Sequence, residues 1–90
     1  MRVQQEITFG ARVLEVISDL GMNQRTAAKL AGIDPGRLSH IIQGQNHPTT
    51  RTMDKMTSAW HVPPFVFYVP RHRAEAEIQT AKNKLKNSVN

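Results

Sequence analysis

The chain has 90 residues, with no cysteine, 12 lysines and arginines against 7 acidic residues, and a formal net charge of +5. This length allows one small domain around a single hydrophobic core, and the absence of cysteine excludes disulfides and thiolate metal sites. No apolar run reaches the length of a membrane span and no signal-peptide pattern opens the chain, so we expect a soluble, cytoplasmic protein without a membrane partner. The positive charge favours a polyanionic partner.

Residues 1–7 carry no strong periodic pattern, and a first helix is predicted from Thr8 to about Leu20. Thr8 suits the N-cap because its hydroxyl oxygen can accept a hydrogen bond from a free backbone N–H group of the first turn. Gly21 suits the C-terminal end, where a left-handed conformation is common, and Met22 can then fold back onto the core. The helix has apolar residues at Phe9, Val13, Leu14, Val16, Ile17 and Leu20.

Residues 24–43 contain two short helical patterns on either side of Gly32. Asn23 can cap the first pattern, whose small and apolar residues gather on one side: Ala27, Ala28, Leu30 and Ala31. The second has apolar residues at the i, i+3, i+4 spacing of a helix packed by one face: Leu38, Ile41 and Ile42. Gly32 can end the first helix, Asp34 can cap the second, and Pro35 fits its first turn. Two short helices joined by a tight glycine turn make a helix-turn-helix.

The small and apolar residues of this motif resemble those of the lambda-repressor-like (Cro/Xre-type) helix-turn-helix DNA-binding family: Ala28, Gly32, Ile33, Leu38 and Ile41. The resemblance runs from about Phe9 to Tyr68 and implies an all-α fold. We expect a compact five-helix domain over residues 1–69, followed by a C-terminal amphipathic helix over residues 70–90. It also implies that Ala28 is the small residue where the two helices cross.

Family members often link the first helix to the end of the recognition helix through buried polar or ionic groups. The matching positions here are Ile17 and Ile42, an apolar pair. Because packed apolar residues can replace a buried ion pair without loss of stability, this departure does not threaten the fold.

The composition of Gly44–Thr49 predicts a loop, and Thr49 is the expected N-cap of a fourth helix that runs to about Trp60. The inward stripe of this helix contains Met53, Met56 and Trp60. His61 occupies the position where the resembled family usually has a helix-ending glycine, and histidine tolerates that conformation better than most residues.

Five large apolar residues, Phe65–Val69, follow a proline pair and predict a short fifth helix or turn. All five cannot face one small core, so we predict a contact surface, and relatives often dimerise through this region. The predicted dimer interface comprises Phe65, Val66, Phe67 and Tyr68. A simpler interpretation, two or three core residues with isolated exposed ones, remains open.

The tail after Pro70 has the apolar spacing of an amphipathic helix, with Ala74, Ile78, Ala81, Leu85 and Val89 on one side. Two interpretations stay open at this point. The helix lies back on the domain, or it takes part in dimerisation.

The resemblance places the recognition helix, Pro35–Gln43, in the major groove of double-stranded DNA. His40 is then a base reader, Arg37 is a guanine reader or a phosphate clamp, and Gly36 lets backbone or a thymine methyl approach closely. Asp34 would repel phosphate and is interpreted as a cap. The candidates for DNA backbone contacts, which set position rather than sequence, are Gln24, Arg25, Ser39, Gln43, Gln45, Asn46 and Arg51.

The sequence contains no metal-ligand spacing among its histidines, no phosphate-binding glycine loop and no nucleophile motif, so we expect neither an enzyme nor a cofactor. The favoured interpretation is a sequence-specific DNA-binding transcriptional regulator, a homodimeric repressor that recognises a palindromic operator. Two alternatives remain. One is an antitoxin or anti-regulator that holds a partner protein through residues 65–69 or the tail, and the other is a helix-turn-helix scaffold that does not bind DNA.

Overall fold

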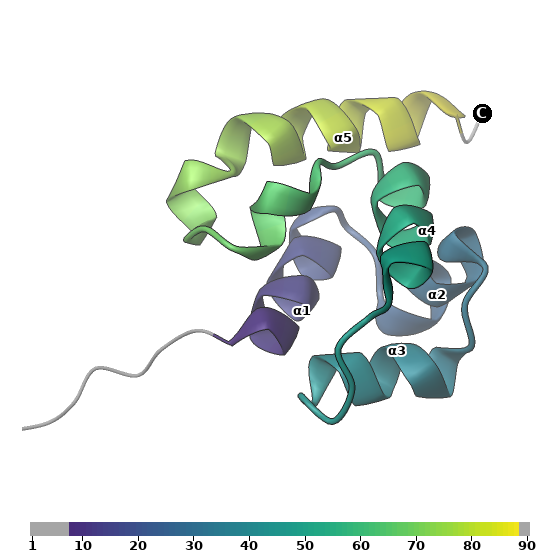
Figure 1. Ribbon diagram of the computed structural model, residues 1–90. Coiled ribbons are helices and arrows are strands. Elements are labelled where there is room, and N and C mark those ends of the chain that lie inside the picture. The colour runs from purple at the N-terminus through teal and green to yellow at the C-terminus, as the bar shows by residue number, and fades with distance from the viewer. Residues whose placement is uncertain (1–7, 89–90) are drawn as a thin grey trace, which may run out of the picture.

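The computed structural model describes residues 8–88 and consists of helices joined by short turns (Figure 1). The four predicted helices of the domain are present, and a short 3-10 helix stands where the fifth helix or turn was expected. The all-α prediction is therefore confirmed. The elements in chain order are α1 (Phe9–Asp19), α2 (Gln24–Ala31), α3 (Pro35–Ile42), α4 (Thr50–Trp60), the 3-10 helices η1 (Pro64–Phe67) and η2 (Arg71–Arg73), and α5 (Glu75–Ser88).

Each predicted N-cap side chain accepts a hydrogen bond from a backbone N–H group three residues later. The distances are 3.1 Å for Thr8, 2.8 Å for Asn23, 3.2 Å for Asp34 and 3.2 Å for Thr49. These bonds satisfy N–H groups that have no partner within the helix itself. Sequence-local chemistry therefore sets the starts of α1 to α4.

The core lies between α1, the helix-turn-helix and α4. The Trp60 side chain is fully buried, and its indole N–H donates a 3.0 Å hydrogen bond to the carbonyl oxygen of Ala27, which joins α4 to α2. Ala28 is also fully buried, and its carbonyl oxygen accepts a bond from the N–H of Ile33 across the turn. Leu14 does not share this core, because 41% of its surface is exposed.

At Gly10, the backbone of α1 lies directly against the backbone at the end of α3. A Cβ atom at this position would lie 2.2 Å from the carbonyl oxygen of Ile42 and 2.6 Å from that of Ile41. The two backbones can pack this closely only because residue 10 has no side chain. Of the two isoleucines expected to link α1 to the end of α3, Ile17 is buried in the core, and Ile42 is partly buried and packs against that core.

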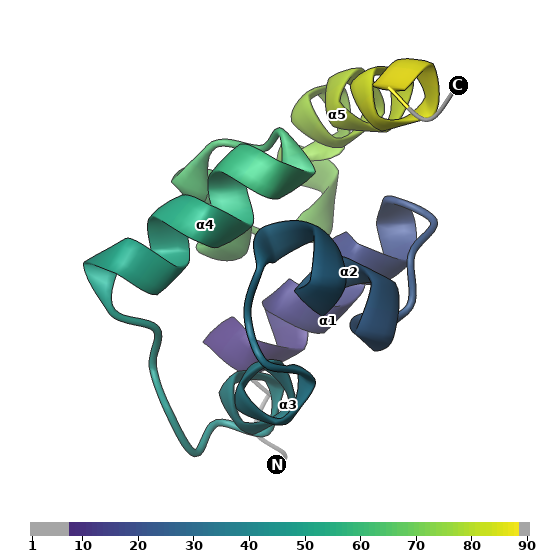
Figure 2. The ribbon, with the colours of Figure 1, turned by 90° about the vertical axis from the view of Figure 1, so that its right-hand side faces the viewer.

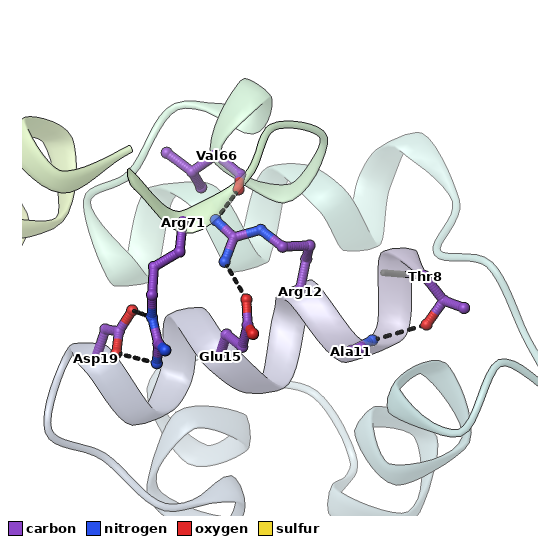
Figure 3. Close-up of polar contacts among 7 residues, drawn as sticks. All are labelled: Thr8, Ala11, Arg12, Glu15, Asp19, Val66 and Arg71. Carbon is purple, nitrogen blue, oxygen red and sulfur yellow. Dashed lines mark hydrogen bonds and ion pairs between the residues drawn. The ribbon is translucent and has the colours of Figure 1, made fainter. Parts of the chain in front are cut away.

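Two arginines fasten the C-terminal segments to α1 (Figure 3). Arg12, only 3% exposed, donates hydrogen bonds to the Glu15 carboxylate at 2.6 Å and to the carbonyl oxygen of Val66 at 2.5 Å. Arg71 binds the Asp19 carboxylate through two hydrogen bonds of 2.7 and 2.9 Å. The hydrogen bonds from Arg71 to Asp19, and then the charge of that carboxylate, raise the pKa of Arg71.

The predicted apolar stripe of the tail lies against the domain. Ala74 and Ala81 are fully buried, Ile78 is buried, and Leu85 is partly buried against the same core. Of the two interpretations of the tail, packing on the domain is the one that this structure has, while a role in dimerisation stays a prediction. Val89 lies outside the described residues.

Helix α3 and the tail helix α5 occupy opposite ends of the molecule. Figure 1 and Figure 2 show α3 at one end and α5 at the other, with α1, α2 and α4 between them. No helix within residues 8–88 combines the length and the apolar character that a membrane crossing requires.

Candidate nucleic-acid interface

Helix α3 presents two different faces. Leu38 and Ile41 are almost completely buried, with exposed fractions of 0% and 1%, and they fix the helix on the core. The predicted base-contacting residues Gly36, Arg37 and His40 are all exposed. The Asp34 carboxylate accepts the N–H of Arg37, which agrees with its interpretation as a cap. The helix is therefore held on the core by one face, while the other face is exposed to solvent.

The C-terminal end of α3 carries a chain of polar contacts. The Gln43 amide donates to the Ser39 hydroxyl at 3.2 Å, and the Gln45 amide donates to the Gln43 side-chain oxygen at 3.0 Å. The backbone N–H groups of Gln45 and Asn46 both point at the carbonyl oxygen of His40, at 2.9 and 3.4 Å. The structure thus brings four predicted backbone-contacting residues together beside His40. Amide and hydroxyl groups of this kind can both donate and accept hydrogen bonds.

A basic groove lies between the helix-turn-helix and the start of α4. It has a volume of about 330 Å³, and its walls carry Arg37, Arg51 and Lys55, with Asp34 as the acidic residue among those that line it. Sequence reasoning missed Lys55. The sequence could have indicated Lys55, because it follows Arg51 by four residues and a helix places both side chains on one face of α4.

Gln24 and Arg25 come from a separate element. They are exposed in the first turn of α2, immediately after its N-cap Asn23. No hydrogen bond within residues 8–88 joins their side chains to those of α3, so their place on DNA remains a prediction.

The charge around this surface is predominantly positive. Residues 24–51 contain four lysines and arginines but one acidic residue, Asp34. The ion pairs of the described chain, Arg12–Glu15 and Arg71–Asp19, both involve α1 instead. The basic side chains of the helix-turn-helix therefore keep their charge available for an anionic partner.

The predicted dimer surface needs a correction. Val66 and Phe67 have exposed fractions of 0% and 1% and belong to the core, so they cannot form an interface on this fold. Phe65 and Tyr68 are 43% and 59% exposed. The tight η1 turn separates the four residues, because it directs the middle two inward and the outer two toward solvent.

Tyr68 belongs to an aromatic cluster on the surface. The Phe9 ring lies 5.4 Å from the Tyr68 ring and 4.6 Å from the His47 ring, centroid to centroid, and 5.7 Å from buried Phe67. Such tilted and edge-on arrangements are favourable for aromatic pairs. The cluster joins the start of α1, the loop after α3 and the segment after η1.

A capped helix-turn-helix with a polar outer face and neighbouring basic side chains is the arrangement of a helix-turn-helix DNA-binding domain. The comparison with family models agrees, because the helix-turn-helix family model matches residues 17–67, more than half of the chain. The chain belongs to this Cro/C1-type, lambda-repressor-like family, and the resemblance expected from residues 9–68 is confirmed. Neither a curated protein nor a solved structure matches in the other two comparisons. Membership of the family makes the protein a DNA-binding transcriptional regulator.

Proposed function

We propose that the protein is a sequence-specific repressor that binds a palindromic operator as a homodimer, with α3 in the major groove. The observation that carries this proposal is that α3 has one buried face and one exposed face. Leu38 and Ile41 are buried, while Gly36, Arg37 and His40 are exposed and available to base edges. In this role His40 contacts a base directly, Gly36 allows close approach, and Arg37 contacts a guanine or a phosphate.

The proposed contacts to the DNA backbone come from three places. Gln24 and Arg25 lie at the start of α2, the Ser39–Gln43–Gln45 chain with Asn46 lies at the end of α3, and Arg51 lies in the basic groove. Lys55 joins this set because it lines the same groove as Arg37 and Arg51. Contacts of this type position the protein and supply affinity without carrying sequence information.

Dimerisation completes the proposed recognition. One domain covers one half-site, whereas a two-fold dimer presents two recognition helices about 34 Å apart, one turn of DNA. Phe65 and Tyr68 could form the dimer interface, which we call the seam, because both have large exposed aromatic surfaces. Aromatic residues often dominate the binding energy of interfaces. A dimer that occupies a promoter can then repress by excluding the polymerase.

The test begins with selection of binding sites from random duplex DNA, from which we expect a palindromic consensus. His40→Ala should then weaken binding to that consensus by about 1–3 kcal/mol and leave binding to random duplex nearly unchanged, as a base contact requires. Arg51→Ala is the matched comparison. It should weaken both kinds of binding equally and reduce the salt dependence by about one phosphate contact.

Two outcomes contradict the proposal. A consensus without two-fold symmetry would exclude the palindromic operator, and equal losses on specific and random DNA for His40→Ala would exclude base readout by His40. Transcription in vitro from a promoter that overlaps the selected site separates repression from activation, because added protein should lower the yield of transcript.

A further inference from the structure

A second hollow lies far from α3, between α5 and the α1–α2 turn. Figure 2 shows the C-terminal half of α5 above this turn, and the hollow has a volume of about 430 Å³. Its residues come from one face of each helix and from the turn between α1 and α2. They are Leu20, Gly21, Met22, Thr26, Leu30, Lys82, Leu85 and Lys86.

The hollow combines an apolar floor with a positive rim. Leu30 is 50% exposed, although the opposite face of α2 is buried, and Leu85 and Met22 are partly buried beside it. Lys82 and Lys86 are one helical turn apart on α5, so both ammonium groups can reach one anion. No acidic residue lines the hollow, and neither lysine forms an ion pair within residues 8–88.

We propose that this hollow is a binding site for a small amphipathic anion, a medium-chain alkyl carboxylate. Its alkyl chain would lie against Leu30, Met22 and Leu85, and its carboxylate would lie between the two lysine side chains. The volume falls in the range of about 300–1,000 Å³ that is typical of small-molecule sites. The Thr26 hydroxyl supplies a further polar group at the wall. The proposal does not depend on the proposed operator or on the dimer.

Two other occupants fit less well. A specific protein partner requires about 20–30 residues on each side, whereas the hollow offers eight lining residues. A second copy of this chain, in a two-fold contact centred on the hollow, would bring Lys82 and Lys86 close to the same lysines of its mate. Like charges brought together in this way disfavour association.

The test uses the complete chain and isothermal titration calorimetry with decanoate below its micelle concentration. We expect saturable binding of one decanoate per chain. Hexanoate should bind at least about tenfold more weakly, because less apolar surface is buried. Decyltrimethylammonium has the same chain length with a positive head group, and it should show no saturable binding.

Variants locate the site. The double variant Lys82→Gln, Lys86→Gln should lose about tenfold in decanoate affinity, and Leu30→Gln should also weaken binding. Lys29→Gln is the matched control, since Lys29 is exposed on α2 but does not line the hollow, and its affinity should be unchanged. Circular dichroism checks that each variant folds, which is expected because the substituted lysines and Leu30 are exposed or half-exposed.

Three results would overturn the proposal. The first is equal binding of decanoate and decyltrimethylammonium, and the second is unchanged decanoate affinity in both the lysine and the Leu30 variants. The third is a change from dimer to monomer in Leu30→Gln by sedimentation, which would make the hollow an interface between copies. Operator binding by these variants is measured in a separate experiment. A loss of operator binding would concern the proposed function and would not count for or against the decanoate site.

Discussion

The Arg12 guanidinium donates a hydrogen bond to the carbonyl oxygen of Val66, 54 residues further along the chain. A buried charge is tolerated only when it is paired and hydrogen-bonded, and Arg12 obtains both from Glu15 and this carbonyl (Figure 3). The contact holds η1 against α1 in one orientation. It therefore helps to determine that Val66 faces the core while Phe65 and Tyr68 face solvent.

Replacement of Arg12 by methionine should lower the free energy of unfolding by about 1–3 kcal/mol, because the Val66 carbonyl loses a charged donor while most of the stem packing is kept. Urea unfolding followed by circular dichroism measures the loss. Glu15→Gln is the control and should cost less, since the Glu15 side chain is 31% exposed and can be hydrated. Equal stability of Arg12→Met and the unmodified protein would show that the contact does not stabilise the fold.

Gly10→Ala should destabilise the protein by about 1–3 kcal/mol or more, because the new methyl group meets the backbone of α3 and the two helices must separate. Thermal melting of Gly36→Ala provides the comparison. A Cβ at position 36 meets the end of the Asp34 side chain at 2.9 Å, which can rotate away, and alanine favours a helix. Its stability should change by less than about 1 kcal/mol. Similar melting temperatures for the two variants would contradict the close approach of α1 and α3.

His61→Gly should raise the stability by up to about 1 kcal/mol. His61 ends α4 with φ 60°, a left-handed conformation in which a side chain is strained and glycine is not. His72→Gly serves as the control, because His72 lies within η2 and has no positive φ. Differential scanning calorimetry should show a higher melting temperature for the first variant alone, and a lower one for His61→Gly would show that the imidazole has a stabilising role.

Tyr68→Ser and Phe65→Ser should give folded monomers that bind the operator weakly, whereas Phe67→Ser should unfold, because loss of a buried phenylalanine costs about 3–5 kcal/mol. Sedimentation combined with thermal melting distinguishes these outcomes. If both folded variants remain dimeric, the seam lies elsewhere and α5 becomes the next candidate. If the unmodified protein is itself monomeric, the homodimer proposal fails and the exposed aromatic residues point to a different protein partner.

The parts of the fold that could be predicted are those set by neighbouring residues. Thr8, Asn23, Asp34 and Thr49 cap helices through contacts three residues away, so their roles can be seen in the sequence. Gly32 ends α2 with φ 68° for the same local reason. The core faces of α3 and α4 also followed from apolar spacing, because each helix packs by one side.

The features that could not be predicted depend on contacts between distant segments. A hydropathy pattern places Arg12 on the surface, but the side chain is buried, where it binds the nearby Glu15 and the Val66 carbonyl oxygen 54 residues away. The need for glycine at position 10 arises from the backbone of α3. Likewise, the 3-10 geometry of η1 determines that Val66 and Phe67 face the core while Phe65 and Tyr68 face solvent. A run of five apolar residues does not specify this geometry.

Phe9 contacts both His47, in the loop after α3, and Tyr68, at the proposed seam. In a dimer joined at Tyr68, the single side chain of Phe9 would separate the dimer contact from the loop that we propose faces the DNA backbone. The distance and the angle between the two α3 helices of such a dimer would then be nearly fixed. Each base pair inserted between the half-sites rotates one half-site relative to the other by about a tenth of a turn. A connection through one side chain is too short to let the second domain rotate by the same amount. The operator should therefore tolerate changes in the identity of its central bases far better than changes in their number.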